Sequence, residues 1–251
     1  MAYYGLHGPY FLVDGEENRR EVRSLEDFSL LYFFDDDLER LEYFDGACLI
    51  LCTGERDDGR YTLRNTQGMV LSAEYDELRA ENDFSSDFPS ERFLGRAGEH
   101  IDILDRDGKV LYSTDLPGVE YCEPQGGGYY ACCVTCSDPD SGEALSSACL
   151  LGPELQMLVP AGTYSYIYRF STEEDGHIVW QDFFAGRKMV NNSFRTDLLD
   201  LSGTVRASDL TAVGSISNGR MAAVRGFSMG LMDLEGNWIS RYSIYDNLEQ
   251  D

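Results

Sequence analysis

The chain has 251 residues, enough for one large all-β domain or two ordinary domains, and 43% of them are hydrophobic, enough for a sizeable core. Its 45 acidic and 20 basic residues give a formal net charge of −25. Such an acidic surface repels the phosphates of nucleic acids and of anionic membranes, so we expect neither as a partner. The 16 tyrosines, 13 phenylalanines and 25 glycines favour strands and turns over helices.

Targeting signals are not recognisable in the sequence. The N-terminal stretch MAYYGLHGPYFLVDGEE has no basic segment followed by an apolar core, so it does not resemble a signal peptide. The longest strongly apolar run, ACLILC at 47–52, is too short to span a membrane. We therefore expect a cytoplasmic protein. In that compartment the seven cysteines are expected to be free, mostly buried thiols rather than a disulfide framework; they are Cys48, Cys52, Cys122, Cys132, Cys133, Cys136 and Cys149.

One short turn recurs along the chain. An aspartate or asparagine opens it, because the side chain can accept a nearby backbone N–H, and a glycine closes it, because glycine tolerates positive φ. The anchors are a degenerate Asp14-Gly15, Asn65-x-x-Gly68, Asp105-x-x-Gly108, a degenerate copy around Gly152, Asp200-x-x-Gly203 and Asp233-x-x-Gly236. Apolar residues flank each turn, which is the pattern of a β-hairpin.

A glycine-led apolar strand precedes the turn in most copies. These strands are DGACLIL at 45–51, GGYYACCV at 127–134, AGRKMV at 185–190 and NGRMAAV at 218–224. A Tyr-Asp-x-Leu segment follows the turn in two copies, at Tyr75–Leu78 and Tyr245–Leu248. Residues 24–44 do not fit the repeat. There Ser24 and Asp27 could form a capping box, so a short helical insertion is predicted.

The anchors predict a single repeat-built β domain over residues 1–251. Six units average about 42 residues, a period typical of β-propellers with four strands per unit. The fold class is therefore all-β, with tandem antiparallel hairpins or meanders forming a six-unit propeller-like domain. The alternative is an open stack of the same β units.

Residues 218–248 and 44–78 resemble the bacterial WG-repeat family. The motif of that family reads approximately as Gly-x-Ala-x-Val, then Trp-Gly-Leu-Ile-Asp-x-x-Gly, then an apolar strand and Tyr-Asp. Here the tryptophan of the Trp-Gly pair is replaced by Met229, Tyr61 and Tyr10 in three copies, and its glycine survives only as Gly230. The resemblance implies a repeat-built β protein and carries over no catalytic residue.

Three motifs that could carry chemistry fit strands and turns better. GFSMG at 226–230 matches the nucleophile elbow, but no histidine follows it. Cys133-x-x-Cys136 has no second cysteine pair at zinc-finger spacing and lies in a strand-like run, so buried strand thiols are expected. DRDGK at 105–109 and DPDSGE at 138–143 are incomplete calcium loops, so at most a weak surface site is expected. No catalytic residue, metal ligand or cofactor is predicted.

TYSYIYRF at 163–170 reads as the most regular strand of the chain. Tyr164, Tyr166, Tyr168 and Phe170 would share one face of it. That face is either a core surface or an aromatic platform for a sugar or a partner's side chain. With Trp180, the three tyrosines are the predicted binding residues.

The sequence favours a non-enzymatic scaffold that binds another protein through its inter-unit loops. The alternative is a propeller that binds or cleaves carbohydrate, with aromatic residues beside a pair of carboxylates. The specific partner and the oligomeric state are not predicted.

Overall fold

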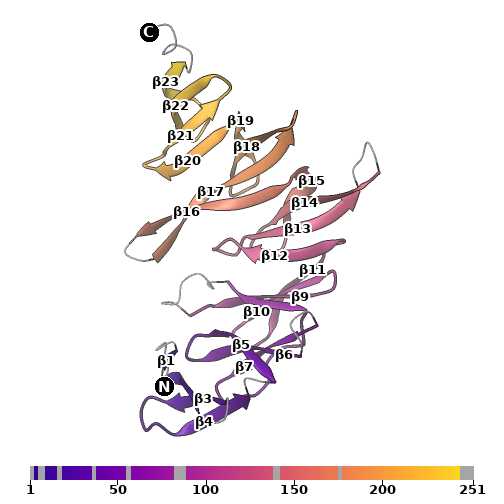
Figure 1. Cartoon of the computed structure of the whole chain (residues 1–251), viewed down its shortest axis with the longest axis vertical. Helices are drawn as coiled ribbons and strands as arrows, with labels where there is room; N and C mark the ends of the chain where they lie inside the picture. The colour runs from indigo at the N-terminus through magenta and orange to yellow at the C-terminus, as the bar shows by residue number, and fades with distance from the viewer. Residues whose placement is uncertain are drawn as a thin grey trace. The chain divides into compact units, whose positions relative to one another are not determined.

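The computed structural model describes residues 3–4, 9–15, 19–35, 38–54, 58–81, 89–137, 142–174 and 177–243. Within these ranges every regular element is a strand, and the strands form six antiparallel sheets (Figure 1). The chain divides into two compact units, Met1–Pro117 and Gly118–Asp251. The all-β fold class, built of tandem meander sheets like the blades of a propeller, is confirmed. The single domain and the closure of the six sheets into a ring stay predictions.

The first unit holds sheets A, B and C. Sheet A contains β1 (Tyr3–Tyr4), β2 (Tyr10–Asp14), β3 (Arg19–Ser24) and β4 (Leu30–Asp35); sheet B contains β5 (Glu39–Phe44), β6 (Cys48–Thr53) and β7 (Arg60–Asn65); sheet C contains β8 (Glu77–Ala80), β9 (Arg92–Ala97), β10 (His100–Asp105) and β11 (Val110–Asp115). Beside β7, bridges at Arg64–Val70 and Tyr61–Tyr75 place residues 70–75 as an irregular fourth strand of sheet B.

The second unit holds sheets D, E and F, each with four strands in sequence order. Sheet D contains β12 (Val119–Pro124), β13 (Tyr130–Ser137), β14 (Ala144–Leu151) and β15 (Met157–Tyr164); sheet E contains β16 (Tyr166–Glu174), β17 (His177–Val190), β18 (Ser193–Asp200) and β19 (Val205–Leu210); sheet F contains β20 (Ala212–Ser217), β21 (Arg220–Arg225), β22 (Ser228–Asp233) and β23 (Trp238–Ser243). The four glycine-led strands of the sequence are confirmed as β6, β13, part of β17 and β21.

The Asp-x-x-Gly turns are confirmed, and each joins the third and fourth strands of a sheet. In the turn after β18, Oδ1 of Asp200 accepts the backbone N–H groups of Ser202 (2.9 Å) and Thr204 (3.0 Å). The same pair of bonds forms at Asn65, Asp105 and Asp233. The closing glycines have φ angles of 77, 77, 79 and 83° for Gly68, Gly108, Gly203 and Gly236.

Three of these glycines also set the contact with the preceding sheet of the same unit. A Cβ atom added to Gly108 would lie 2.2 Å from the carbonyl oxygen of Leu71, in the fourth strand of sheet B. One added to Gly203 would lie 2.7 Å from the oxygen of Leu158 in β15, and one on Gly236 3.0 Å from the oxygen of Arg206 in β19. Only glycine permits this approach, because any side chain would overlap the neighbouring backbone.

The turn predicted near residue 14 is assigned to the wrong pair of strands in its unit. Asp14-Gly15 lies between β2 and β3, the second and third strands of sheet A. The equivalent turn joins β3 to β4. In it Oγ of Ser24 accepts the N–H of Glu26 at 3.1 Å, and Phe28 takes the positive φ of 60°.

Sheet D has a variant of the turn, as the degenerate motif suggested. Leu155 donates its N–H to the carbonyl of Gly152 at 2.9 Å and takes the positive φ of 59°. A buried leucine therefore occupies the place that glycine has in sheets B, C, E and F.

The helical insertion predicted over 24–44 is wrong in the described part of that segment. Residues 30–35 form β4 and residues 39–44 form β5. The residues read as a capping box instead make two local turns, since Asp27 accepts the N–H of Ser29 at 3.1 Å. The run of leucine and aromatic residues that follows suits a strand better than a helix.

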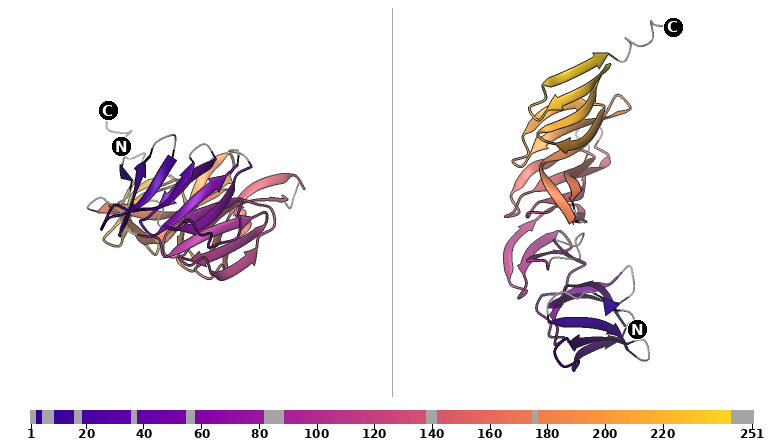
Figure 2. Two further views of the ribbon diagram at one scale, coloured as in Figure 1. Left: turned by 90° about the horizontal axis from the view of Figure 1, so that it is seen from below. Right: turned by 90° about the vertical axis from the view of Figure 1, so that its left-hand side faces the viewer.

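Within each unit the sheets follow one another as a stack, which the ribbon views show (Figure 2). Buried apolar residues fill the spaces between neighbouring sheets. Between sheets E and F the core contains Phe170, Ala185, Leu198, Leu210, Met221 and Met232. Between sheets D and E it contains Ala148, Leu150, Tyr164, Ile167, Phe184 and Leu199. Sheet E therefore buries side chains on both of its faces.

Replacing Gly203 by alanine should destabilise the protein more than replacing Gly219. Both glycines have positive φ, 79° and 70°, so each substitution costs about 1–2 kcal/mol of backbone strain. Nothing lies within 4 Å of a Cβ on Gly219, whereas one on Gly203 meets Leu158, which should add about 1–3 kcal/mol. Urea unfolding of both variants measures the difference, and equal losses would contradict the role assigned to the turn glycine.

Replacing Asp200 by asparagine should make the free energy of unfolding fall less steeply as the pH is lowered. Burial raises the pKa of Asp200, but hydrogen bonds from Ser202, Thr204 and Arg206 outweigh it, so its pKa lies below the ordinary value of 3.8. A lowered folded-state pKa stabilises the protein above about pH 4 and loses that effect as the pH falls. Unfolding free energies measured from pH 7 to pH 3 should show a steeper decline for the natural protein than for Asp200→Asn.

Candidate functional site

The structure separates the residues predicted to form one aromatic platform. Tyr164 ends β15 in sheet D, Ser165 lies in no strand, and Tyr166 begins β16 in sheet E. The shared face is therefore wrong for Tyr164, which packs in the core between sheets D and E. Tyr168 and Phe170 pack on the opposite face of sheet E, toward sheet F.

Tyr164 is part of an inter-sheet contact. Its ring lies over Gly186, where an added Cβ would come within 2.7 Å of it, and its hydroxyl donates to Oδ2 of Asp197 at 3.0 Å. Gly186 and Asp197 lie directly opposite each other on β17 and β18. Burial, and then the nearby charge of Asp197, raise the pKa of Tyr164. The side chain is 4% exposed, so it belongs to the packing of the sheets.

The first unit repeats this contact between sheets B and C. The Tyr75 ring lies over Gly95, and its hydroxyl donates to Oδ2 of Asp102 at 2.8 Å. Gly95 and Asp102 are again directly opposite, here on β9 and β10. We call this arrangement the tyrosine latch. Two copies with the same register relation indicate a structural element of the repeat.

Trp180 is also engaged in packing. Its indole lies against Gly126, where an added Cβ would be 2.2 Å from Nε1. The guanidinium of Arg169 lies 6.0 Å from the Trp180 ring centroid and donates to the carbonyl oxygen of Gly126 at 2.6 Å. Trp180 is half-buried, so only part of its ring faces solvent.

Solvent-exposed aromatic side chains gather on the first strands of sheets D and E and on the third strand of sheet E. Tyr121 on β12 is 38% exposed and Tyr166 on β16 is 42% exposed, and both line one small hollow. The rings of Tyr166 and the half-buried Tyr168 lie 5.8 Å apart. Arg187, opposite Tyr166 on β17, lies 4.7 Å from the ring centroid of Phe194, which is 50% exposed. We call Tyr121, Tyr166, Tyr168, Arg187 and Phe194 the tyrosine edge.

Charges of both signs border the tyrosine edge. Burial and the carboxylate of Glu123 raise the pKa of Tyr166. Burial also raises the pKa of Tyr168, and the positive charge of Arg187 opposes that shift. Both phenols therefore remain protonated at neutral pH and can donate or accept hydrogen bonds.

The hollow beside the tyrosine edge is very small. Its volume is about 10 Å³, which is room for about one water molecule. Ordinary small-molecule pockets have volumes of about 300–1,000 Å³. The hollow is therefore too small to hold an ordinary small-molecule ligand.

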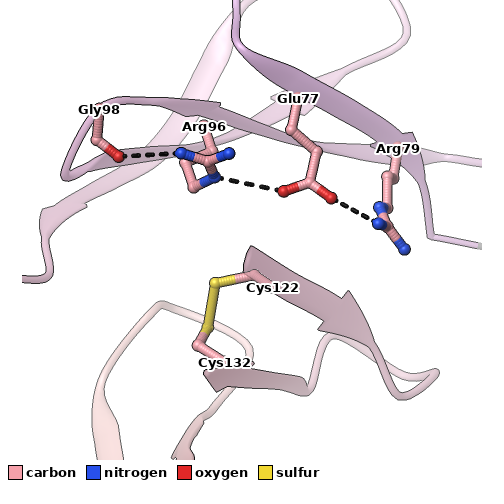
Figure 3. Close-up of a disulfide and its surroundings, with 6 residues drawn as sticks. All are labelled: Glu77, Arg79, Arg96, Gly98, Cys122 and Cys132. Carbon is pink, nitrogen blue, oxygen red and sulfur yellow. Dashed lines mark hydrogen bonds and ion pairs between the residues drawn. A yellow bond between two sulfur atoms is a disulfide. The ribbon is translucent and has the colours of Figure 1, made fainter. Parts of the chain in front are cut away.

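A larger cavity, of about 190 Å³, lies in the first unit and contains two glutamates. Glu42 is paired with Arg40. Glu77 is paired with Arg79 at 2.5 Å and with Arg96 at 3.2 Å, and Arg96 also donates to the carbonyl of Gly98 (Figure 3). Both carboxylates are thus held by guanidinium groups, which differs from the free acid and base of a glycosidase.

The motifs tested for chemistry fall into strands and turns. Ser228 of GFSMG begins β22 directly after the turn from β21, and the described residues after it, up to 243, form strands and a turn and no helix. Asp105 of DRDGK uses Oδ1 to close its turn. Residues 138–141 of DPDSGE and the copy Tyr245–Leu248 lie outside the described residues. In the described part of the chain, no cluster of three or more His, Cys, Asp or Glu residues could hold a metal ion.

The expectation that all cysteines are free is wrong for two of them. Cys122 and Cys132 form a disulfide between β12 and β13 (Figure 3). Cys48, Cys52 and Cys149 are free and buried. Cys133 and Cys136 are free strand thiols as predicted, although they are only half-buried. The disulfide depends on strand register, which residue spacing alone does not reveal.

Comparisons with known proteins identify no family. No family model matches the chain, so the resemblance to WG repeats stays a prediction. A segment of 58 residues is 38% identical to the "18 kDa heat shock protein" of Clostridium acetobutylicum, covering 23% of this chain and 38% of that protein. No helix long and apolar enough to cross a membrane occurs among the residues that the structure describes.

Solved β-repeat structures are similar over most of the chain at low identity. BamB from Moraxella catarrhalis has a TM-score of 0.41 at 11% identity, covering 95% of this chain and 72% of that one. The C-terminal WD40 domain of Sif2 has a TM-score of 0.38 at 13% identity, covering 94% and 67%. The computationally designed Ika8 protein has a TM-score of 0.31 at 11% identity, covering 95% and 85%.

Replacing Tyr164 by phenylalanine should destabilise the protein by about 1.5–3 kcal/mol, because it removes a buried hydrogen bond to a carboxylate. Tyr166→Phe is the matched control, since its exposed hydroxyl should contribute less than about 0.5 kcal/mol. Chemical unfolding of both variants is the measurement. If Tyr164→Phe leaves the free energy of unfolding unchanged, the structural role assigned to the tyrosine latch is wrong and a binding role for Tyr164 becomes possible again.

Proposed function

We propose that the protein is a non-enzymatic scaffold that binds another protein through the tyrosine edge. The observation that carries this proposal is the gathering of Tyr121, Tyr166 and Phe194, each 38–50% exposed, on one part of the second unit. Large aromatic side chains gain most when they are removed from water, in a protein core or at an interface. Exposing several of them together fits a surface that a partner covers.

The composition of the edge favours a protein partner. Tyrosine and arginine are enriched among the residues that dominate binding energy at protein interfaces. Tyr166 is stacked near Tyr168, and Arg187 lies over the Phe194 ring. Side chains held by such contacts lose little conformational entropy when a partner binds, so more of the contact energy remains as affinity.

Shape and charge narrow the kind of partner. A surface whose hollow measures only about 10 Å³ suits a protein better than a small molecule, which needs a concave pocket. Glu123 and Arg187 border the edge with opposite signs, so a partner with both signs in complementary places would be selected.

The carbohydrate alternative has weaker support. Four aromatic residues were predicted to form the binding site. Of these, Tyr164 is hydrogen-bonded to Asp197 and Trp180 packs on Gly126. Tyr168 is half-buried against the core of sheets E and F. Tyr166 alone presents a substantially exposed ring.

The cytoplasmic location expected from the sequence is disfavoured by the Cys122–Cys132 disulfide. Disulfides persist mainly in oxidising environments. Five of the cysteines are free thiols, so the protein is not a disulfide-rich domain of the kind found in small secreted proteins.

Site-specific cross-linking tests the proposal. A photoreactive phenylalanine analogue placed at position 121 or 166 should give the same protein adduct in the native host. The adduct should be lost when Tyr166→Ala is combined with the probe at 121, because the partner loses a central contact. Mass spectrometry of the adduct identifies the partner, and binding of the purified pair then measures an expected loss of at least tenfold for Tyr166→Ala.

The matched control is the same probe at Tyr242, which is 68% exposed on sheet F. An adduct at 242 but not at 121 or 166 would contradict the choice of surface. Binding of purified protein to a glycan array that Tyr166→Ala abolishes, with no protein adduct at either position, would support the carbohydrate alternative instead.

A further inference from the structure

Three cysteines form one row across sheet D. Cys122 on β12 lies directly opposite Cys132 on β13, and Cys132 lies directly opposite Cys149 on β14. Cys122 and Cys132 are joined by a disulfide, with their Cα atoms 4.0 Å apart (Figure 3). Cys149 is a free thiol. The central sulfur therefore has a bonded sulfur on one side and a thiol on the other.

The register places all three side chains on the same face of the sheet. Directly opposite residues on antiparallel strands share a face, with Cβ atoms about 4.5–5.5 Å apart. Directly opposite residues on antiparallel strands have Cα atoms about 4.5–5.5 Å apart. This separation lies within the range of about 4.4–6.8 Å that disulfides usually span, so Cys132 is within reach of Cys149. Cys133 points to the other face, opposite Tyr121 and Ala148, and is excluded from the row.

We propose that the disulfide can move along this row by thiol–disulfide exchange. The Sγ atom of Cys149, as thiolate, attacks Sγ of Cys132. A bond between these two sulfurs forms while the bond from Cys132 to Cys122 breaks. Cys122 leaves as a thiolate and takes up the proton that Cys149 released. One disulfide and one thiol are present before and after, so the step needs no oxidant or reductant.

The order of the strands suits the direction of attack. Exchange proceeds by attack of a thiolate on a disulfide sulfur, and the leaving sulfur departs on the far side. Neighbouring strands lie about 4.8 Å apart, and β13 lies between β14 and β12. The attacking sulfur of Cys149 and the leaving sulfur of Cys122 thus lie on opposite sides of the Cys132 sulfur.

Burial controls the rate of this step. Burial raises the pKa of Cys149 to about 11, so its thiolate is scarce at neutral pH. Below that pKa the thiolate fraction rises about tenfold for each pH unit. Exchange should therefore be slow at pH 7 and about a hundredfold faster at pH 9.

The two disulfides tie different strands. β12 is an edge strand, so β13 is its one neighbour in sheet D, and the Cys122–Cys132 bridge links this pair. After exchange the bridge links β13 to β14 and leaves β12 without a covalent link to β13. Because Tyr121 precedes Cys122 on β12, the exchange would loosen one strand of the tyrosine edge. The exchange itself does not depend on the proposed interaction.

Disulfide mapping of the folded protein tests the exchange. The protein, with accessible thiols first blocked by an alkylating agent, is held at pH 9 without added thiol or oxidant. It is then quenched in acid, labelled with a second alkylating agent and digested without reduction. The expected result is a Cys132–Cys149 peptide together with newly labelled Cys122, both accumulating much faster at pH 9 than at pH 7.

Two variants provide the controls. Cys149→Ser should keep the Cys122–Cys132 bridge and show no new label on Cys122, whereas Cys133→Ser should exchange like the natural protein. The proposal is overturned if the natural protein at pH 9 retains only the Cys122–Cys132 disulfide. It is also overturned if a new disulfide joins Cys132 to a cysteine other than Cys149. The natural protein gives a decisive result even where a variant fails to fold.

Discussion

The rest of the fold depends on a turn whose four residues do two tasks at once. At Asp200–Gly203 the aspartate side chain accepts two backbone N–H groups and so fixes a tight hairpin end. The closing glycine then lies against the backbone of the preceding sheet, at a distance that no side chain would allow. Hairpin closure and sheet spacing are therefore set by the same residues. This coupling explains how the turn can recur while the strands around it vary.

The tyrosine latch adds a second contact between neighbouring sheets. A buried hydroxyl needs a partner, and Asp102 or Asp197 supplies it, while the facing glycine makes room for the ring. The turn glycine reaches back to the preceding sheet, and the latch tyrosine reaches forward to the following one. The B–C and D–E contacts are thus held from both directions. Side chains that look like a binding platform in the sequence are in part the residues that make these contacts.

Local features could be predicted from the sequence, and features that depend on sheet boundaries could not. The turns at Asn65, Asp105, Asp200 and Asp233 follow from aspartate or asparagine and glycine chemistry within four residues. The run TYSYIYRF alternates without interruption, so nothing in it marks that the chain leaves sheet D at Ser165 and enters sheet E. The hydrogen bond of the latch joins residues 27 and 33 positions apart in the two copies, and the latch requires the register of two strands. The row of three cysteines requires the register of three.

The division of labour among the tyrosines bears on function. Tyr75 and Tyr164 lie at fourth strands, and both form latches with the following sheet. Tyr121 and Tyr166 lie on the first strands β12 and β16 and form no latch. β16 enters the cores between sheets through Ile167 and Phe170, whereas Tyr121 and Tyr166 are not among the core residues, so these two can vary without disturbing the contacts that set sheet spacing. Aromatic residues there are free to meet a partner. The repeat thus separates the residues that hold the array together from those that can recognise something else, which is what an interaction scaffold requires.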